Sequence, residues 1–201
     1  PLLYATLAEV VEEKAGIINL GLEGVMLMGA VAGFATTVQT GNAALGVLAA
    51  ALAGGGFNLL FGFLVITRRA NQLASGLALM FCGVGLSALL GVPFIGSRIR
   101  GLDEIPIPLL FDLPIVGGMF FNYDILVYLA GPVAILVWWV LFSTRWGLSL
   151  RAVGENPTAA FAAGKNPYIL QYQALLIAGF LGGIAGAHLS IAIAKTWAEW
   201  M

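Results

Sequence analysis

Residues 44–66 read ALGVLAAALAGGGFNLLFGFLVI, an apolar run in which no side chain carries a charge. The run lies within a longer stretch, residues 24–67, that contains no Asp, Glu, Lys or Arg. A helix needs about 20 apolar residues to cross the roughly 30 Å hydrocarbon core of a bilayer. The stretch is therefore long enough for two membrane crossings, with a polar turn at residues 39–42 between them.

Three further stretches lack charged residues, and each has room for about one crossing: 70–97, 125–144 and 166–194. We therefore predict membrane-spanning helices over residues 20–38, 44–66, 73–91, 125–143 and 169–191, with the end of another helix in residues 1–11. Strands of a transmembrane barrel alternate apolar and polar side chains with period two, and these runs do not. The predicted fold is an all-α, polytopic transmembrane helix bundle that forms one domain over residues 1–201.

The composition argues against most soluble functions. Apolar residues make up 60% of the 201 residues and charged residues only 9%, whereas a soluble domain carries about 25% charged residues. The formal net charge of −1 gives no basic field that would attract nucleic acid. The single cysteine, Cys82, excludes an intramolecular disulfide framework, and we expect it to be an inert core residue. The chain starts at Pro1 without an initiator methionine, so we interpret it as a fragment of a longer membrane protein.

The few basic residues predict how the helices are oriented in the membrane. Lys and Arg concentrate in cytoplasmic loops. Alternation of the predicted spans places one set of basic residues on one side: Lys14, Arg68, Arg69, Arg145, Arg151 and Lys165. The smaller set on the opposite side is Arg98, Arg100 and Lys195. We therefore expect the first set to be cytoplasmic, which makes residues 92–124 an extracytoplasmic loop and residues 144–168 a cytoplasmic loop.

The two long loops differ in character. The loop over 92–124 is rich in Pro and Gly, so it is not a continuous helix. It fits either a surface loop packed on the membrane or a short re-entrant element that docks an external partner. In the loop over 144–168, Asn156 and Pro157 predict a helix start, and Gly164 predicts a stop. The predicted helix, residues 157–163, is either a connector or a rigid element that fits a groove on another protein.

Pairs of glycines four residues apart predict close contact between helix backbones. The pairs are Gly29 with Gly33, Gly179 with Gly183, and Gly182 with Gly186. Asn58 lies deep in the second predicted span, where we expect it to join helices by hydrogen bonds. His188, in the fifth predicted span, is likewise expected to be a satisfied residue between helices.

Several motifs of this chain resemble those of ABC-importer inner-membrane permeases of the simple-sugar and nucleoside branch, in the branched-chain amino acid and ribose permease superfamily. They are AGIINLGLEG at 15–24, MLMGA at 26–30, RANQ at 69–72, SGLAL at 75–79, GSRIRGL at 96–102 and RAVGENP at 151–157. The resemblance covers essentially the whole chain and keeps the family's order.

The resemblance implies a division of labour among subunits. This chain would move a nucleoside or simple sugar across the cytoplasmic membrane by alternating access, as a multi-pass permease surrounded by lipid. Cytoplasmic ABC ATPase subunits would hydrolyse ATP, an extracytoplasmic lipoprotein would deliver substrate, and a second permease chain, identical or different, would complete the complex. The residues implied in coupling to the ATPase are Arg151, Gly154, Glu155, Asn156, Pro157, Ala159, Ala160 and Gly164.

Polar residues in or beside the apolar runs are candidates for the translocation path. They are Asn19, Glu23, Asn71, Gln72 and Ser75. Asn and Ser could equally cap helices, and Glu23 could be a first-turn acid stabilised by helix N-terminal amides. Both interpretations remain open for each residue.

Two other transport functions fit less of the sequence. One is a branched-chain amino acid or ribose ABC permease. The other is an ion-coupled secondary transporter, for which only Glu23 and His188 are candidate coupling groups. The sequence has no Walker lysine motif, nucleophile elbow or paired metal ligands, so we predict no catalytic residue, cofactor or metal in this chain.

Overall fold

The computed structural model describes residues 1–103, 105–106 and 122–198 of the chain. Its elements are, in chain order, α1 (Leu2–Lys14), α2 (Leu22–Thr40), α3 (Ala43–Gly62), the π-helix η1 (Phe63–Thr67), α4 (Gln72–Gly91), the 3-10 helix η2 (Val92–Phe94), β1 (Ile105–Pro106), β2 (Asn122–Tyr123), α6 (Ile125–Ser143), α7 (Arg145–Glu155), α8 (Pro157–Ala162), α9 (Pro167–Ala187) and the π-helix η3 (His188–Ala194). The antiparallel pair of β1 and β2 is the only sheet in this described part. The prediction of an all-α bundle is confirmed.

Five helices in the described residues are long and apolar enough to cross a membrane: Leu22–Thr40, Ala43–Thr67, Gln72–Phe94, Ile125–Ser143 and Pro167–Ala194. Each overlaps one predicted span. Four of them start where an Asn or Asp side chain accepts hydrogen bonds from the first free backbone N–H groups. The capping residues are Asn42 for α3, Asn71 for α4, Asp124 for α6 and Asn166 for α9.

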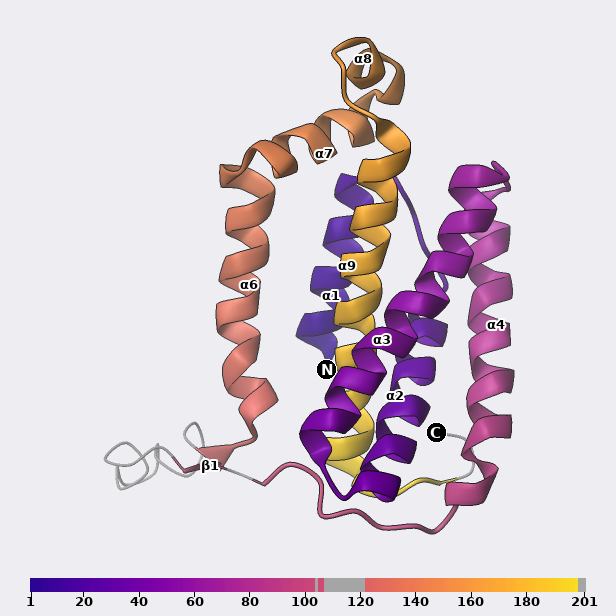
Figure 1. Cartoon of the computed structure of the whole chain (residues 1–201), viewed down its shortest axis with the longest axis vertical. Coiled ribbons are helices and arrows are strands. Elements are labelled where there is room, and N and C mark those ends of the chain that lie inside the picture. The colour runs from indigo at the N-terminus through magenta and orange to yellow at the C-terminus, as the bar shows by residue number, and fades with distance from the viewer. Residues whose placement is uncertain (104, 107–121, 199–201) are drawn as a thin grey trace.

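Helix α9 is the central element of the bundle. It packs against α1, α2 and α3, and α2 packs in addition against α4. Figure 1 shows α6 standing beside this group, with α7 crossing the end of the bundle and α8 projecting beyond it. Near the other end of α6, the hydroxyl of Tyr4 in α1 donates a hydrogen bond to the carbonyl of Leu126 at 2.7 Å. Helix α6 is therefore attached to the bundle at both of its ends.

Glycines bring the helix backbones around α9 into direct contact. A Cβ on Gly29 of α2 would lie only 2.6 Å from the Cα of Gly183, and one on Gly54 of α3 would lie 2.5 Å from the carbonyl oxygen of Gly179. A Cβ on Gly186 would overlap the carbonyl oxygen of Met26. The predicted role of the small residues in close helix packing is confirmed, and these contacts lie within one chain.

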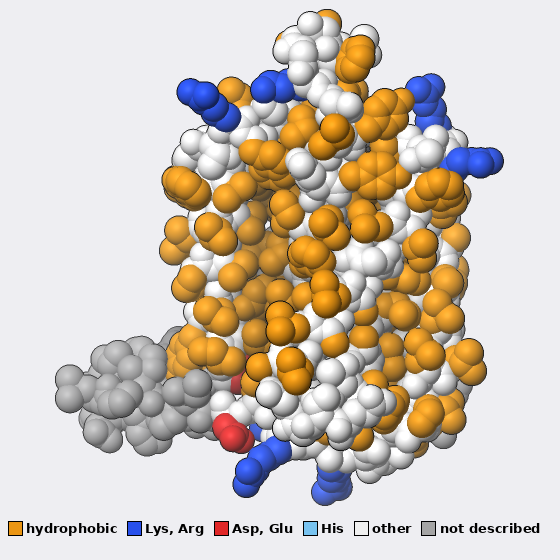
Figure 2. Space-filling model, in the orientation of Figure 1, with side chains coloured by type: hydrophobic (Ala, Val, Ile, Leu, Met, Phe, Trp, Pro, Cys, Tyr) orange, Lys and Arg blue, Asp and Glu red, His pale blue; other side chains and the backbone are white. Residues whose placement is uncertain are grey.

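Charged and apolar side chains are segregated along the bundle. Figure 2 shows Lys and Arg side chains at the two ends and apolar side chains over the flank between them. Arg145 and Lys165 line a hollow at the end that carries α7 and α8, which we call the α8 end. Arg98 and Arg100 line a hollow at the opposite end, beside the turn between α2 and α3. The two basic sets therefore lie at opposite ends, as predicted.

The first part of the long loop after α4 packs on the end opposite α8. Phe94 and Ile99 contact the buried Phe34 and Trp197, and the backbone N–H of Gly96 donates to the carbonyl of Trp197 at 3.1 Å. Residues 92–103 therefore form a surface segment that packs on the bundle. The two interpretations of the remainder, as surface loop or re-entrant element, fall largely on residues 107–121, which lie outside the described residues.

Two expectations are wrong in detail. Residues 145–155, which lie in the loop predicted over 144–168, form the helix α7, because the Thr144 hydroxyl caps its start and Leu150 and Val153 pack into a buried cluster. Cys82, expected in the core, is exposed on α4. Only one face of α4 meets α2, and Cys82 lies outside that contact.

Candidate functional site

The short helix α8 is built by local capping. The Asn156 side-chain oxygen accepts a hydrogen bond from the backbone N–H of Ala159 at 3.0 Å, and Pro157 occupies the first helical position. At the other end, Gly164 has a φ of +80°, a left-handed conformation that favours glycine. The helix predicted over residues 157–163 is confirmed, with the structure ending it at Ala162.

Helix α7 anchors α8 to the bundle. It begins where the Thr144 hydroxyl oxygen accepts a hydrogen bond from the N–H of Gly147 at 3.1 Å. Leu150 and Val153 are fully buried in a cluster with Val11 of α1 and Leu141 of α6. Because this face is packed against both α1 and α6, movement of α7 would act on both helices.

The eight residues implied in coupling divide into two groups. Five are exposed at the α8 end: Glu155, Asn156, Pro157, Ala159 and Gly164. Ala160 is buried, and Arg151 and Gly154 are partly buried. The guanidinium of Arg151 lies 4.9 Å from the centre of the Phe142 ring, so it packs on α6. The first group is available to a partner, whereas the second holds α7 and α8 in place.

Gly154 lies against the loop that follows α1. A Cβ on Gly154 would overlap the carbonyl oxygen of Lys14, and a Cβ on Gly16 would lie 2.9 Å from the carbonyl oxygen of Gly154. The two backbones touch without an intervening side chain. Gly154 is thus a packing residue between α7 and residues 14–16.

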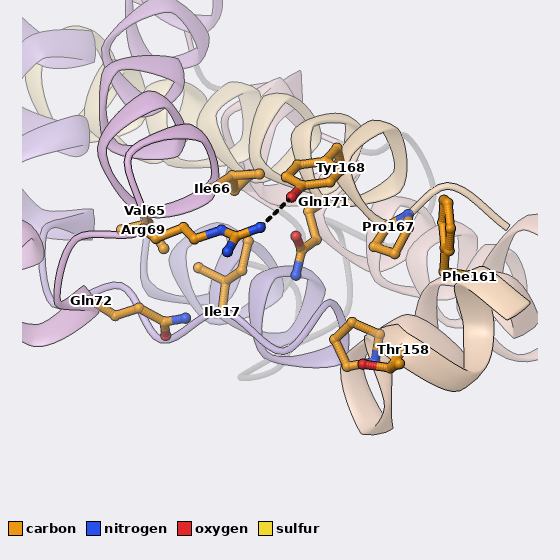
Figure 3. Close-up of a pocket in the computed structure, with 11 residues that line it drawn as sticks. Ile17, Val65, Ile66, Arg69, Gln72, Thr158, Phe161, Pro167, Tyr168 and Gln171 are labelled. Carbon is orange, nitrogen blue, oxygen red and sulfur yellow. Dashed lines mark hydrogen bonds between the residues drawn. The ribbon is translucent and has the colours of Figure 1, made fainter.

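A cleft of about 510 Å³ opens beside α8. Figure 3 shows Arg69 pointing toward Tyr168 across it, and the Arg69 Nη2 donates to the Tyr168 hydroxyl at 3.0 Å. Gln72 and Gln171 also line the cleft, and Phe161 of α8 closes one side. The Phe161 side chain is 66% exposed, so its ring is accessible at this end of the bundle.

A cluster of three buried polar side chains lies below this end of the bundle. The Asn58 Nδ2 donates to the Glu12 Oε1 at 2.6 Å and to the Leu175 carbonyl at 2.7 Å. The Asn19 Nδ2 donates to the Asn58 Oδ1 at 2.9 Å. Glu12 and Asn58 have no exposed surface and Asn19 has 1%. The expected role of Asn58 in joining helices is confirmed, because its bonds connect α1, α3 and α9.

The structure brings two of the five path candidates together at the loop between α1 and α2. Asn19 belongs to the buried cluster, and Gln72 accepts a hydrogen bond from the N–H of Ile18 at 2.9 Å. Ser75 is buried on α4. Asn71 caps α4 by accepting from the N–H of Ala74 at 3.0 Å. Glu23 is different, since its side chain is exposed in the first turn of α2.

Sequence reasoning missed Glu12 as a buried residue. The signal was available, because Glu12 shares a helical face with the buried residues Tyr4, Ala8 and Ala15. It also missed the partner of His188. The His188 Nε2 lies 3.2 Å from the Asp124 Oδ2, 64 positions away in the sequence, so no local pattern indicates the pair. The expectation that His188 is a satisfied residue between helices is confirmed for its Nε2 atom.

Comparison with known proteins gives a family for the chain. Residues 1–199 match the family model described as the branched-chain amino acid transport system / permease component. The chain is 38% identical to the putative glucose ABC transporter permease protein TsgC13 of Haloferax volcanii, over 100% of this chain and 62% of that protein.

Two further relatives are similar over nearly the whole chain. Identity is 37% to the nucleoside ABC transporter permease protein NupC of Lactococcus lactis subsp. cremoris, over 96% of this chain and 64% of that protein. Identity is 35% to the guanosine ABC transporter permease protein NupQ of Bacillus subtilis, over 96% of this chain and 65% of that protein. The chain thus spans less than two thirds of the length of these relatives. No solved structure matches the chain.

Proposed function

Because the chain belongs to the branched-chain amino acid transport system / permease component family, we propose that it is the permease subunit of an ATP-driven importer for a nucleoside or simple sugar. The membership confirms the resemblance seen in the sequence motifs. With its five apolar helices, the chain is a multi-pass protein of the cytoplasmic membrane. The family is one of transporter permease components, and ATP hydrolysis on a separate subunit is part of the proposal.

The observation that carries the proposal is that helix α8, at the α8 end of the bundle, is capped and exposed. Asn156 and Gly164 set its two ends, so it presents a fixed shape to a partner. Phe161 offers an exposed aromatic ring, and Glu155, at the end of α7, offers an exposed carboxylate. A cytoplasmic ATPase with a matching groove would bind this helix in the way that helix-in-groove complexes form.

The proposed mechanism couples closure of the ATPase pair to alternating access. Closure on ATP would move α8. Only one residue, Asn156, separates α8 from α7 in the chain, so α7 would move with it. The packed face of α7 would carry that movement to α1 and α6. Rearrangement of these helices against the central α9 would open the path on one side of the membrane and close it on the other.

Glu23 is the residue that we propose for the path itself. An ionisable side chain within a transmembrane segment normally faces a bundle interior or a water-filled cavity, because exposure to lipid costs about 2.5–3.5 kcal/mol at the bilayer centre. The Glu23 side chain is exposed in this chain, so the cavity it faces would be completed by the second permease subunit. Its carboxylate would accept hydrogen bonds from substrate hydroxyl groups.

Substrate class follows from the relatives. Those named above are described as glucose, nucleoside and guanosine permeases, and we propose a hydroxyl-bearing substrate of the same kind. An extracytoplasmic lipoprotein would deliver it. The decisive experiment expresses the whole protein with the ATPase and lipoprotein encoded in neighbouring reading frames. Uptake of labelled guanosine, uridine, glucose and arabinose is then measured in vesicles, with labelled leucine as a comparison.

The proposal expects uptake of at least one of these compounds, and only when the ATPase and ATP are present. Uptake that persists without the ATPase and follows a proton or sodium gradient would favour the ion-coupled alternative. Uptake of leucine in place of these compounds would favour the branched-chain amino acid alternative.

Removal of the α8 cap is expected to weaken the partner contact moderately. Asn156→Ala deletes the oxygen that accepts from Ala159, and loss of such a cap costs about 1 kcal/mol of helix stability. Affinity of the solubilised protein for its ATPase should fall about five-fold, as measured by biolayer interferometry. Asn42→Ala is the matched control, because Asn42 caps α3 in the same way at the opposite end. Equal effects of the two variants would contradict the assignment of α8.

A further inference from the structure

We propose that the loop between α1 and α2, residues 15–21, transmits movement of α7 to α2 and α4. Glu12, Asn19 and Asn58 are the positioning residues that hold this α1–α2 loop in the required form. The inference rests on the function proposed above, and it adds a second route into the bundle besides the direct connections of α7 and α8 to α6 and α9.

The first step is the contact between α7 and the loop. Gly16 and Gly154 meet backbone to backbone, and a Cβ on either would run into the other segment. Gly16 has a φ of +78°, so its backbone conformation also favours glycine. Side chains can yield by changing rotamer, but two touching backbones cannot. A displacement of the end of α7 therefore displaces the start of the loop.

The second step is the attachment of the loop to its surroundings. The N–H of Ile17 donates to the Glu12 carbonyl at 3.0 Å, which closes the end of α1 onto the loop. The Gln171 side chain of α9 donates to the Ala15 carbonyl at 3.3 Å, and Ile18 donates to Gln72 at the start of α4. The loop therefore has hydrogen-bonded connections to α1, α4 and α9.

The third step is the buried cluster under the loop. Asn19 accepts from the N–H of Gly21 at 2.8 Å with its oxygen and donates to Asn58 with its nitrogen. The amide of Asn58 in turn donates both of its protons, one to Glu12 and one to Leu175. Because these groups are shielded from water, loss of one partner leaves another unsatisfied, and the conformation of residues 19–21 becomes less defined.

The fourth step is the exit from the loop into α2 and α4. A Cβ on Gly21 would lie 2.8 Å from the Gly76 carbonyl oxygen, and one on Gly24 would lie 2.8 Å from the Leu79 carbonyl oxygen. These are again backbone contacts without side chains between them. A continuous series of stiff contacts thus leads from α7 through the loop to α4, and Glu23, the proposed path residue, lies between Gly21 and Gly24.

A purely structural cluster would stabilise the bundle without taking part in coupling, and two variants separate the possibilities. Glu12→Gln keeps an oxygen that can accept from Asn58 and Asn19, whereas Glu12→Leu removes it. We expect the complex with Glu12→Gln to resemble wild type. With Glu12→Leu, guanosine or glucose uptake per ATP hydrolysed should fall at least ten-fold, whichever of the two the wild type transports.

Three quantities are measured on the same purified complex in proteoliposomes: its yield, ATP hydrolysis and uptake. A wild-type ratio of uptake to hydrolysis in Glu12→Leu would overturn the inference. It would also be overturned if both activities fell only in proportion to the yield, since that is the result of a structural role. Absence of ATP-driven uptake in the wild type would instead refute the proposed function.

Discussion

Gly183→Leu is expected to prevent folding of the bundle. A side chain at this position would overlap the Ala50 carbonyl oxygen of α3, and Gly29 of α2 approaches the same residue. All of these neighbours are backbone atoms within packed helices, so they cannot move aside without separating α9 from α3. Adding one or two methylene groups to a packed core already costs about 1–3 kcal/mol. Replacing glycine by leucine adds four carbon atoms, so the cost here should be larger. The total stability of a folded protein is only about 5–15 kcal/mol.

The measurement is the yield of monodisperse protein after extraction into mild detergent, followed by size-exclusion chromatography. Gly56→Leu is the matched control, because Gly56 lies on α3 where an added Cβ meets no atom within 4 Å. We expect Gly183→Leu to give aggregated or degraded protein and Gly56→Leu to give the wild-type profile. Wild-type behaviour of Gly183→Leu would show that the packing around α9 is wrong.

Phe161→Asp is expected to weaken binding of the ATPase by about 30-fold or more while the bundle stays folded. Phe161 is exposed on α8 and makes the largest apolar contribution to that helix. An aspartate would bring an unpaired charge into the contact, where desolvation is costly. If Phe161 is a hot spot of the contact, its loss costs about 2 kcal/mol or more, which corresponds to about 30-fold in affinity. Uptake should fall at least as far.

Two controls separate loss of the ATPase contact from loss of folding. Phe161→Leu keeps an apolar side chain and should retain most of the affinity. Both variants should elute from size-exclusion chromatography like the wild type, because Phe161 packs little against the rest of the chain. Wild-type uptake by Phe161→Asp would count heavily against a coupling role for α8.

The spans and α8 were predictable because their signals are local. An apolar run without charge predicts a membrane crossing wherever it occurs, and Asn156 with Pro157 marks a helix start by the chemistry of two adjacent residues. Helix α7 was missed although part of its signal is local, since Thr144 caps its start and Leu150 and Val153 share one helical face. Its sequence, RWGLSLRAVGE, contains two glycines, which weaken that signal.

The buried cluster and the histidine pair were hidden because their partners are distant in the sequence. Asn58 lies 46 positions from Glu12, and the packing of both α1 and α3 against α9 brings them together. The packing of the helices also decides which hydrogen bonds the path candidates make. Asn71 and Gln72 carry ordinary amide groups, and the structure assigns them to the capping of α4 and to the α1–α2 loop. Glu23 has an exposed side chain in the first turn of α2, a position at which a carboxylate also stabilises the helix N-terminus.

Site-specific cross-linking of α8 tests the central claim most directly. Thr158→Cys places a thiol on the exposed side of α8, and Gln39→Cys places one at the opposite end of the bundle, both in a Cys82→Ser background. A photoactivatable maleimide attached to each thiol is irradiated in the whole complex, and the products are identified by mass spectrometry. The account predicts that position 158 captures the ATPase subunit and that position 39 does not. Capture of the ATPase from position 39, or its absence from position 158 in a complex that transports, would contradict it.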